Sequence, residues 1–182
     1  MQTIDFDTRS VFIGGQWQPA SFGRTLPLLN PSDGHELTQI ARGSPAEIDA
    51  AVHAAQAAFD GPWGQLTAAE RGRILMRMSA RVVELADVLA RMEALDVGKP
   101  VKQGMADALA LARYLEFYGG AADKVMGETI PFANGYTALT LREPHGVTGH
   151  IVPWNYPMQI IGRSVGAAPG VGPGLCREIG RA

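Results

Sequence analysis

The segment GVTGHIVPWNYP, residues 146–157, is the part of the sequence that decides the fold. Residues 146–152 are rich in β-branched side chains and predict a strand, and the prolines at 153 and 157 restrict the loop that follows it. Residues 158–168 then have apolar side chains at helical spacing. A strand, a loop and a helix in this order open a parallel α/β sheet, so we predict an α/β fold.

The first of three long helices predicted upstream begins at Ser44. Ser44 is a typical N-cap, Pro45 suits the first helical position, and Glu47 completes a capping box. Apolar residues then recur on one face until the Gly-Pro pair at 61–62, where we expect the helix to end.

A second capping box, Thr67 with Glu70, predicts a helix that continues as far as Asp96. The third helix is predicted over residues 101–125, although the glycine pair at 119–120 could bend or end it.

Shorter elements surround these helices. Residues 11–18, VFIGGQWQ, predict a hairpin about a Gly-Gly turn, and residues 30–34, NPSDG, predict a second turn. Residues 137–142, TALTLR, alternate in polarity and predict a strand.

The composition excludes several classes of protein. Hydrophobic residues make up 46% of the 182 positions, which is typical of a packed globular protein. With 16 basic and 18 acidic side chains the net charge is −2, so we expect neither nucleic acid nor an anionic membrane surface as a partner. No long apolar run predicts a membrane span.

The opening residues and the cysteine count favour the cytoplasm. Residues 1–10 carry two aspartates and no apolar stretch, which is unlike a secretory leader. The single cysteine, Cys176, cannot form an internal disulfide, and the four histidines are too scattered for a zinc site.

Asn155 is the best candidate for a chemical role. It follows the predicted strand, between two prolines, where polar side chains of α/β sheets meet ligands. The alternative is that Asn155 only hydrogen-bonds its own turn while Trp154 packs in the core. Spacing alone favours this second interpretation.

Five motifs in order resemble the NAD(P)-dependent aldehyde dehydrogenase superfamily. They are NPSDG (30–34), WGQLTAAERGRIL (63–75), LDVGKP (95–100), YGGAADKVMGE (118–128) and TLREPHGVTGHIVPWNYP (140–157). The resemblance covers residues 11–168 and weakly favours members that act on betaine aldehyde and similar substrates. It implies short N-terminal strands, three long helices, an edge strand and the first unit of an incomplete Rossmann-like sheet.

The resemblance also implies the chemistry. In the family a cysteine thiolate attacks an aldehyde, hydride passes to NAD or NADP, and a glutamate activates water to release a carboxylate. Asn155 matches the side-chain amide that stabilises the oxyanion, and it also belongs to the surface against which the dinucleotide lies. The other members of that surface are Ile151, Val152, Pro153 and Trp154.

Asp96, in LDVGKP, matches a position that holds a monovalent cation in some relatives, together with backbone oxygen near Leu29. The alternative, that Asp96 is a polar residue closing a helix before Gly98, is favoured by residue type.

Four parts follow from the resemblance. They are residues 1–135 (N-terminal strands and helical part of the cofactor-binding domain), 136–143 (bridging or oligomerisation strand), 144–168 (first unit of the nucleotide-binding sheet) and 169–182 (an unmatched Gly/Pro-rich tail). The abrupt change at the tail suggests a shifted reading frame or a truncated product.

The family's catalytic cysteine and glutamate lie far downstream in relatives, and Cys176 comes too early to be the nucleophile. We therefore expect an N-terminal fragment of a homo-oligomeric enzyme that is inactive alone. The alternative is a non-catalytic fragment that associates with intact subunits.

Overall fold

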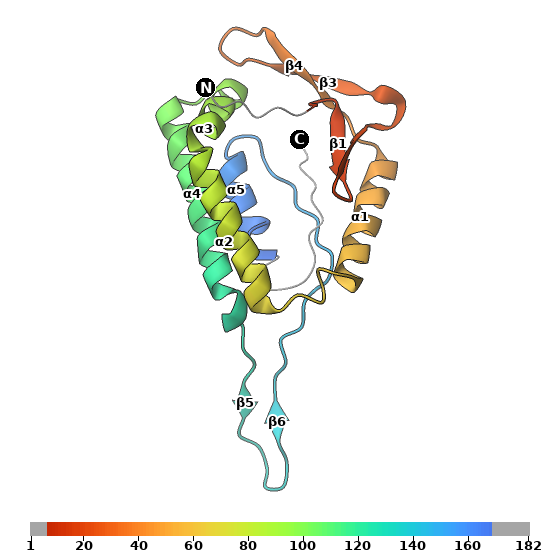
Figure 1. Cartoon of the computed structure of the whole chain (residues 1–182), viewed down its shortest axis with the longest axis vertical. Helices are drawn as coiled ribbons and strands as arrows, with labels where there is room; N and C mark the ends of the chain where they lie inside the picture. Colours follow the sequence, from red (N-terminus) through yellow and green to blue (C-terminus); the bar gives the residue numbers. More distant parts are fainter. Residues whose placement is uncertain (1–6, 169–182) are drawn as a thin grey trace.

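The computed structural model describes residues 7–168. Its helices are α1 (Pro45–Asp60), α2 (Ala68–Glu84), α3 (Ala86–Val97), α4 (Val101–Ala121) and α5 (Pro157–Ser164), with 3-10 turns η1 (Ser21–Gly23) and η2 (Ala122–Lys124). Its strands are β1 (Ser10–Ile13), β2 (Gln16–Pro19), β3 (Thr25–Leu29), β4 (Glu36–Ala41), β5 (Thr129–Ile130) and β6 (Ala138–Leu139). Figure 1 shows α2, α4 and α5 grouped together, with α1 standing apart beside β1.

The described strands form three antiparallel hairpins rather than one sheet. β1 pairs with β2 about Gly14 and Gly15, whose φ angles of 60° and 81° suit a tight turn, which confirms the predicted first hairpin. β3 pairs with β4 around the predicted turn at 30–34. β5 and β6 form a narrow arm that extends away from the helices (Figure 1).

The predicted start of α1 is confirmed. Ser44 is its N-cap, and Glu47 Oε2 accepts a hydrogen bond from the Ser44 backbone N–H at 2.6 Å. The other carboxylate oxygen, Oε1, accepts from the backbone N–H of Ser21 at 2.5 Å and so links α1 to η1. Hydrogen bonds from Ser21 and Ser44 lower the pKa of Glu47 to about 2.

The predicted helix from Thr67 to Asp96 is instead two helices, so that prediction was wrong in its interior. Leu85, with φ −100° and ψ 5°, separates α2 from α3, and its N–H bonds to the carbonyls of both Arg81 and Val82. No glycine or proline marks this position, and apolar side chains recur across it, so the sequence carries no signal for the break.

The third predicted helix is confirmed over most of its length. α4 continues through Gly119 and Gly120 to Ala121, and η2 completes the turn. Gly119 faces Gly72 of α2, and both glycines allow the two backbones to approach closely.

Within the described residues 7–168, residues 146–152 do not form a strand, so this prediction was wrong. A strand of this type needs a neighbour for its backbone groups, and the described residues place none beside it. The strand predicted over 137–142 is confirmed only at Ala138–Leu139, where it pairs with β5.

Small side chains dominate the interior. Among residues 7–168, seven of the twelve buried hydrophobic residues are alanines. One core cluster joins Ala86 of α3, Ala108 of α4 and Met158 of α5. This cluster lies where α3, α4 and α5 meet, and α5 begins directly after the loop that carries Asn155.

Candidate active site

The loop over residues 153–156 leads into α5 and presents Asn155 to solvent. Pro157 occupies the first turn of the helix, and Tyr156 is the N-cap with φ −139°. Within the described residues the Asn155 side chain forms no hydrogen bond, so its amide is open to a ligand. The oxyanion role of Asn155 and its turn-forming alternative both stay predictions.

Of the residues before Asn155, one is buried and the others expose apolar side chains. Val152 is 1% exposed and packs inward, whereas Ile151 and Trp154 are 81% and 57% exposed. Pro153 is also exposed. The predicted cofactor residues other than Val152 are thus all exposed.

A separate pocket of about 300 Å³ lies between the first hairpin and α1. It is lined by Phe12, Ile13 and small residues of the turn and of α1, and it includes none of the predicted site residues. We therefore assign the site from Asn155 and its neighbours, not from this pocket.

Beneath the loop lies a buried charged cluster that begins in the LDVGKP motif. Lys99, between α3 and α4, places Nζ 2.9 Å from Glu93 Oε1 and 2.6 Å from Asp107 Oδ2. The three side chains are 11%, 3% and 0% exposed respectively. One ammonium group thus serves two buried carboxylates.

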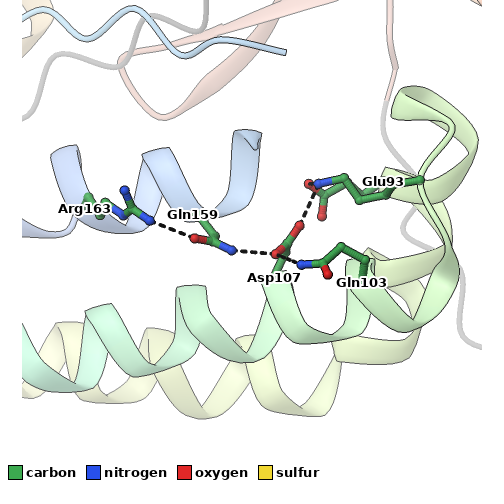
Figure 2. Close-up of polar contacts among 6 residues, drawn as sticks. Glu93, Gln103, Asp107, Gln159 and Arg163 are labelled. Atoms are coloured by element: carbon green, nitrogen blue, oxygen red, sulfur yellow. Dashed lines mark hydrogen bonds and ion pairs between the residues drawn. The ribbon is translucent and has the colours of Figure 1, made fainter. Parts of the chain in front are cut away.

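Amide side chains extend this cluster to α5 (Figure 2). Asp107 Oδ1 accepts from Gln103 Nε2 at 2.9 Å and from Gln159 Nε2 at 2.6 Å. Gln159 in turn accepts a hydrogen bond from Arg163 Nη2 at 2.9 Å. α3, α4 and α5 are therefore joined by one continuous polar network.

The pKa values of the two buried carboxylates shift in opposite directions. Burial raises the pKa of Glu93, and Oε2 of this carboxylate has no hydrogen-bond partner among the described residues. Burial also acts to raise the pKa of Asp107, but hydrogen bonds from Lys99, Gln159 and Gln103 outweigh it and hold that pKa below its usual value. Asp107 is thus the better stabilised anion.

Comparison with known proteins decides the family, since residues 17–172 match the Aldehyde dehydrogenase family model. The chain belongs to the aldehyde dehydrogenase family. The match ends four residues beyond Ala168, where we predicted the resemblance to end.

Relatives in this family are similar over nearly the whole chain. A hydroxyisobutyraldehyde dehydrogenase from Mycolicibacterium austroafricanum is 41% identical over 93% of this chain and 34% of its own length. The mitochondrial aldehyde dehydrogenase of Rattus norvegicus is 39% identical over 89% of this chain and 32% of its own. The chain spans about a third of these relatives.

Solved aldehyde dehydrogenase structures confirm the predicted fold class. A Burkholderia cenocepacia protein assigned to the aldehyde dehydrogenases superposes with a TM-score of 0.88 and 61% identity, over 90% of this chain and 34% of that one. A Bacillus cereus aldehyde dehydrogenase solved with NAD+ gives 0.88 and 35%, over 93% and 34%. The α/β fold with incomplete sheets is that of an aldehyde dehydrogenase segment.

In this aldehyde dehydrogenase chain, sequence reasoning missed the role of Lys99, Asp107 and Gln159. In the LDVGKP motif the sequence analysis assigns a role to Asp96 only. The signal was available, because Asp107 is an isolated acid within the apolar run of α4, where a buried carboxylate requires a partner. Gln103, four residues earlier on the same helix face, was a second indication.

Asp96 lies half-buried in the last turn of α3. The turn after Leu29 does reach this helix end, because a β-carbon added to Gly98 would lie 2.7 Å from Pro31 Cγ. The described residues contain no cluster of three or more His, Cys, Asp or Glu side chains suited to a metal ion. A monovalent cation at Asp96 stays a prediction.

Two further predictions concern location and the tail. Within residues 7–168 no helix is long and apolar enough to cross a bilayer. Cys176 and the tail over 169–182 lie outside the described residues. The cytoplasmic location stays a prediction.

Proposed function

We propose that this chain forms the N-terminal part of an enzyme that oxidises an aldehyde to a carboxylate with NAD(P)+. In that enzyme Asn155 donates a hydrogen bond to the substrate oxygen as negative charge develops on it. The exposed Asn155 amide, on a loop bounded by two prolines and anchored by buried Val152, is the observation that carries this proposal. A neutral amide on a fixed loop suits oxyanion stabilisation because it needs no reorganisation during the reaction.

The residues present also fit part of a dinucleotide site. NAD(P)+, when bound, accepts the hydride. Ile151, Pro153 and Trp154 expose apolar surface, and buried Val152 anchors the backbone between them. We assign these residues to a surface against which the flat rings of the cofactor lie, because apolar walls with few polar groups are typical of such sites.

The 182-residue polypeptide on its own is proposed to be inactive. The resemblance implies that the nucleophilic cysteine and the base that activates water lie further downstream, and this chain spans 34% of the length of the Mycolicibacterium relative. The one cysteine, Cys176, lies beyond residue 172, where the family match ends.

A second candidate function is association without catalysis. The β5–β6 arm exposes Phe132 and Tyr136 at 71% and 73%, and its two-residue strands leave backbone groups at both edges. An arm of this kind can add to the sheet edge of an intact aldehyde dehydrogenase subunit.

The test joins residues 1–168 to the downstream part of the Burkholderia cenocepacia relative and compares the result with its Asn155→Ala variant. We expect kcat to fall by ~10² or more while cofactor affinity and Tm change little. If Asn155 only forms a turn, Tm falls and kcat stays within a few-fold. The 182-residue chain, assayed alone, should reduce no NAD(P)+ with any aldehyde.

A further inference from the structure

The ammonium group of Lys99 contacts the loop that carries Asn155. Besides its two carboxylate partners, Lys99 Nζ lies 4.3 Å from the ring centre of Tyr156, the residue directly after Asn155. The Lys99 side chain is 11% exposed, whereas Tyr156 is 42% exposed, so the contact is shielded from water on the lysine side only. Contacts of this type strengthen when they are desolvated.

The same cluster binds the first turn of α5, which directly follows the loop. Gln159, four residues after Asn155, donates to the carboxylate of Asp107 at 2.6 Å. Asp107 is fully buried, and its other oxygen binds Lys99. Tyr156 and Gln159 are thus fixed by two members of one ion pair.

We propose that Lys99 is a positioning residue, which together with Asp107 holds Asn155 in place through Tyr156 and Gln159. This inference rests on the proposed function, because the position of Asn155 affects catalysis only if its amide contacts the substrate. An error of about 1 Å in such a group can cost ~10² in rate, so a buried and rigid support is useful.

The competing explanation is that the cluster only joins α3, α4 and α5. In that case its loss lowers the stability of all three helices, and the loop follows only when the helices unfold. The two explanations differ in the mobility of position 155 within the folded protein.

A nitroxide spin label at position 155 of the 182-residue chain measures that mobility. The background carries Cys176→Ser, which removes the one natural cysteine, and Asn155→Cys carries the label. Two variants break the support without adding bulk, namely Lys99→Met and Gln159→Met. Two others preserve it, namely Tyr156→Phe, which keeps the ring, and Lys102→Met, which removes an exposed lysine from the same region of α4.

We expect the ratio of mobile to immobile label to rise by roughly threefold to thirtyfold in Lys99→Met, the range for a lost cation–π contact. Gln159→Met should raise it in the same direction. Tyr156→Phe and Lys102→Met should leave the spectrum unchanged. Far-UV circular dichroism checks that each variant remains folded.

Lys99→Met leaves two carboxylates buried without a cation and can unfold the chain. Gln159→Met removes no charge, so it decides the question in that event. An unchanged spectrum in folded Lys99→Met or Gln159→Met, with a lowered Tm, overturns the proposal. The label reports no catalysis, so a failure of the oxyanion role of Asn155 appears only in the kcat experiment and is distinguishable from this one.

Discussion

Gly72 of α2 and Gly119 of α4 meet backbone to backbone at the crossing of their helices. A β-carbon added to Gly72 would lie 2.4 Å from the Gly119 carbonyl oxygen, and one added to Gly119 would lie 2.9 Å from the Gly72 carbonyl oxygen. Real β-carbons do not come this close to backbone atoms, so the separation of α2 and α4 depends on both glycines.

Gly119→Ala should therefore destabilise the chain, whereas Gly120→Ala should stabilise it. The first substitution forces two helices apart and should cost about 1–3 kcal/mol. A β-carbon at Gly120 meets nothing within 4 Å, so alanine there should add about 0.5 kcal/mol through helix propensity. Urea unfolding of the two variants measures both effects, and equal signs would contradict this description of the crossing.

The free energy of unfolding should depend on Glu47 at low pH. Its pKa is lowered to about 2 in the folded chain from an ordinary 4.5, so its contribution is complete above pH 4.5 and declines as the pH falls towards 2. Glu47→Gln should flatten the dependence of Tm on pH in that window.

Glu70→Gln is the matched control, because Glu70 forms the equivalent capping box with Thr67 at the start of α2. Glu47 has an additional bond to Ser21, 26 residues away. The loss of Tm at pH 6 should accordingly be larger for Glu47→Gln, and a larger loss for Glu70→Gln would show that the link to η1 contributes little.

Asp107→Ala should destabilise the chain far more than Asp87→Ala. Removing Asp107 leaves Lys99 with one partner in a buried setting, for which about 3–5 kcal/mol is typical. Asp87 pairs with Arg91 at 3.1 Å on the exposed side of α3, and such pairs contribute at most about 1 kcal/mol. Denaturant titration compares them, and similar losses would mean that water reaches the cluster.

The β5–β6 arm should promote association of the chain. Phe132→Ser with Tyr136→Ser should shift sedimentation profiles towards the monomer, because two exposed and mutually packed aromatic rings are lost. Phe22→Ser is the control, since Phe22 is 88% exposed on η1, outside the arm. An equal shift in the control would indicate non-specific hydrophobic association instead of a role of the arm.

The sequence predicted those features of the fold that depend on interactions between residues close together in the chain, such as the starts of helices. The capping residues Ser44 and Thr67 marked the starts of α1 and α2 because they bond to backbone within three residues. The break at Leu85 was not predictable, since no residue that ends helices stands there, and α3 makes its main contacts with α4, which follows it in the chain.

In the candidate site, too, the sequence predicted the residue with a local signal and missed the residues that meet only through packing. Asn155 was found because prolines flank it in the sequence, whereas Asp107 and Gln159 are 52 residues apart and meet only after α4 and α5 pack together. The strand expected over 146–152 required neighbours that the described residues do not place beside it. The features that could not be predicted are therefore those that depend on contacts between residues far apart in the sequence.

The predominance of alanine in the core restricts how this segment can change. A side chain that is already a single methyl group can be shortened only to glycine, so almost any other substitution there must enlarge it. Random mutation at these positions therefore meets crowding far more often than it opens a cavity. Selection for heat resistance is accordingly expected to change caps, turns and surface charges and to leave the helix contacts as they are.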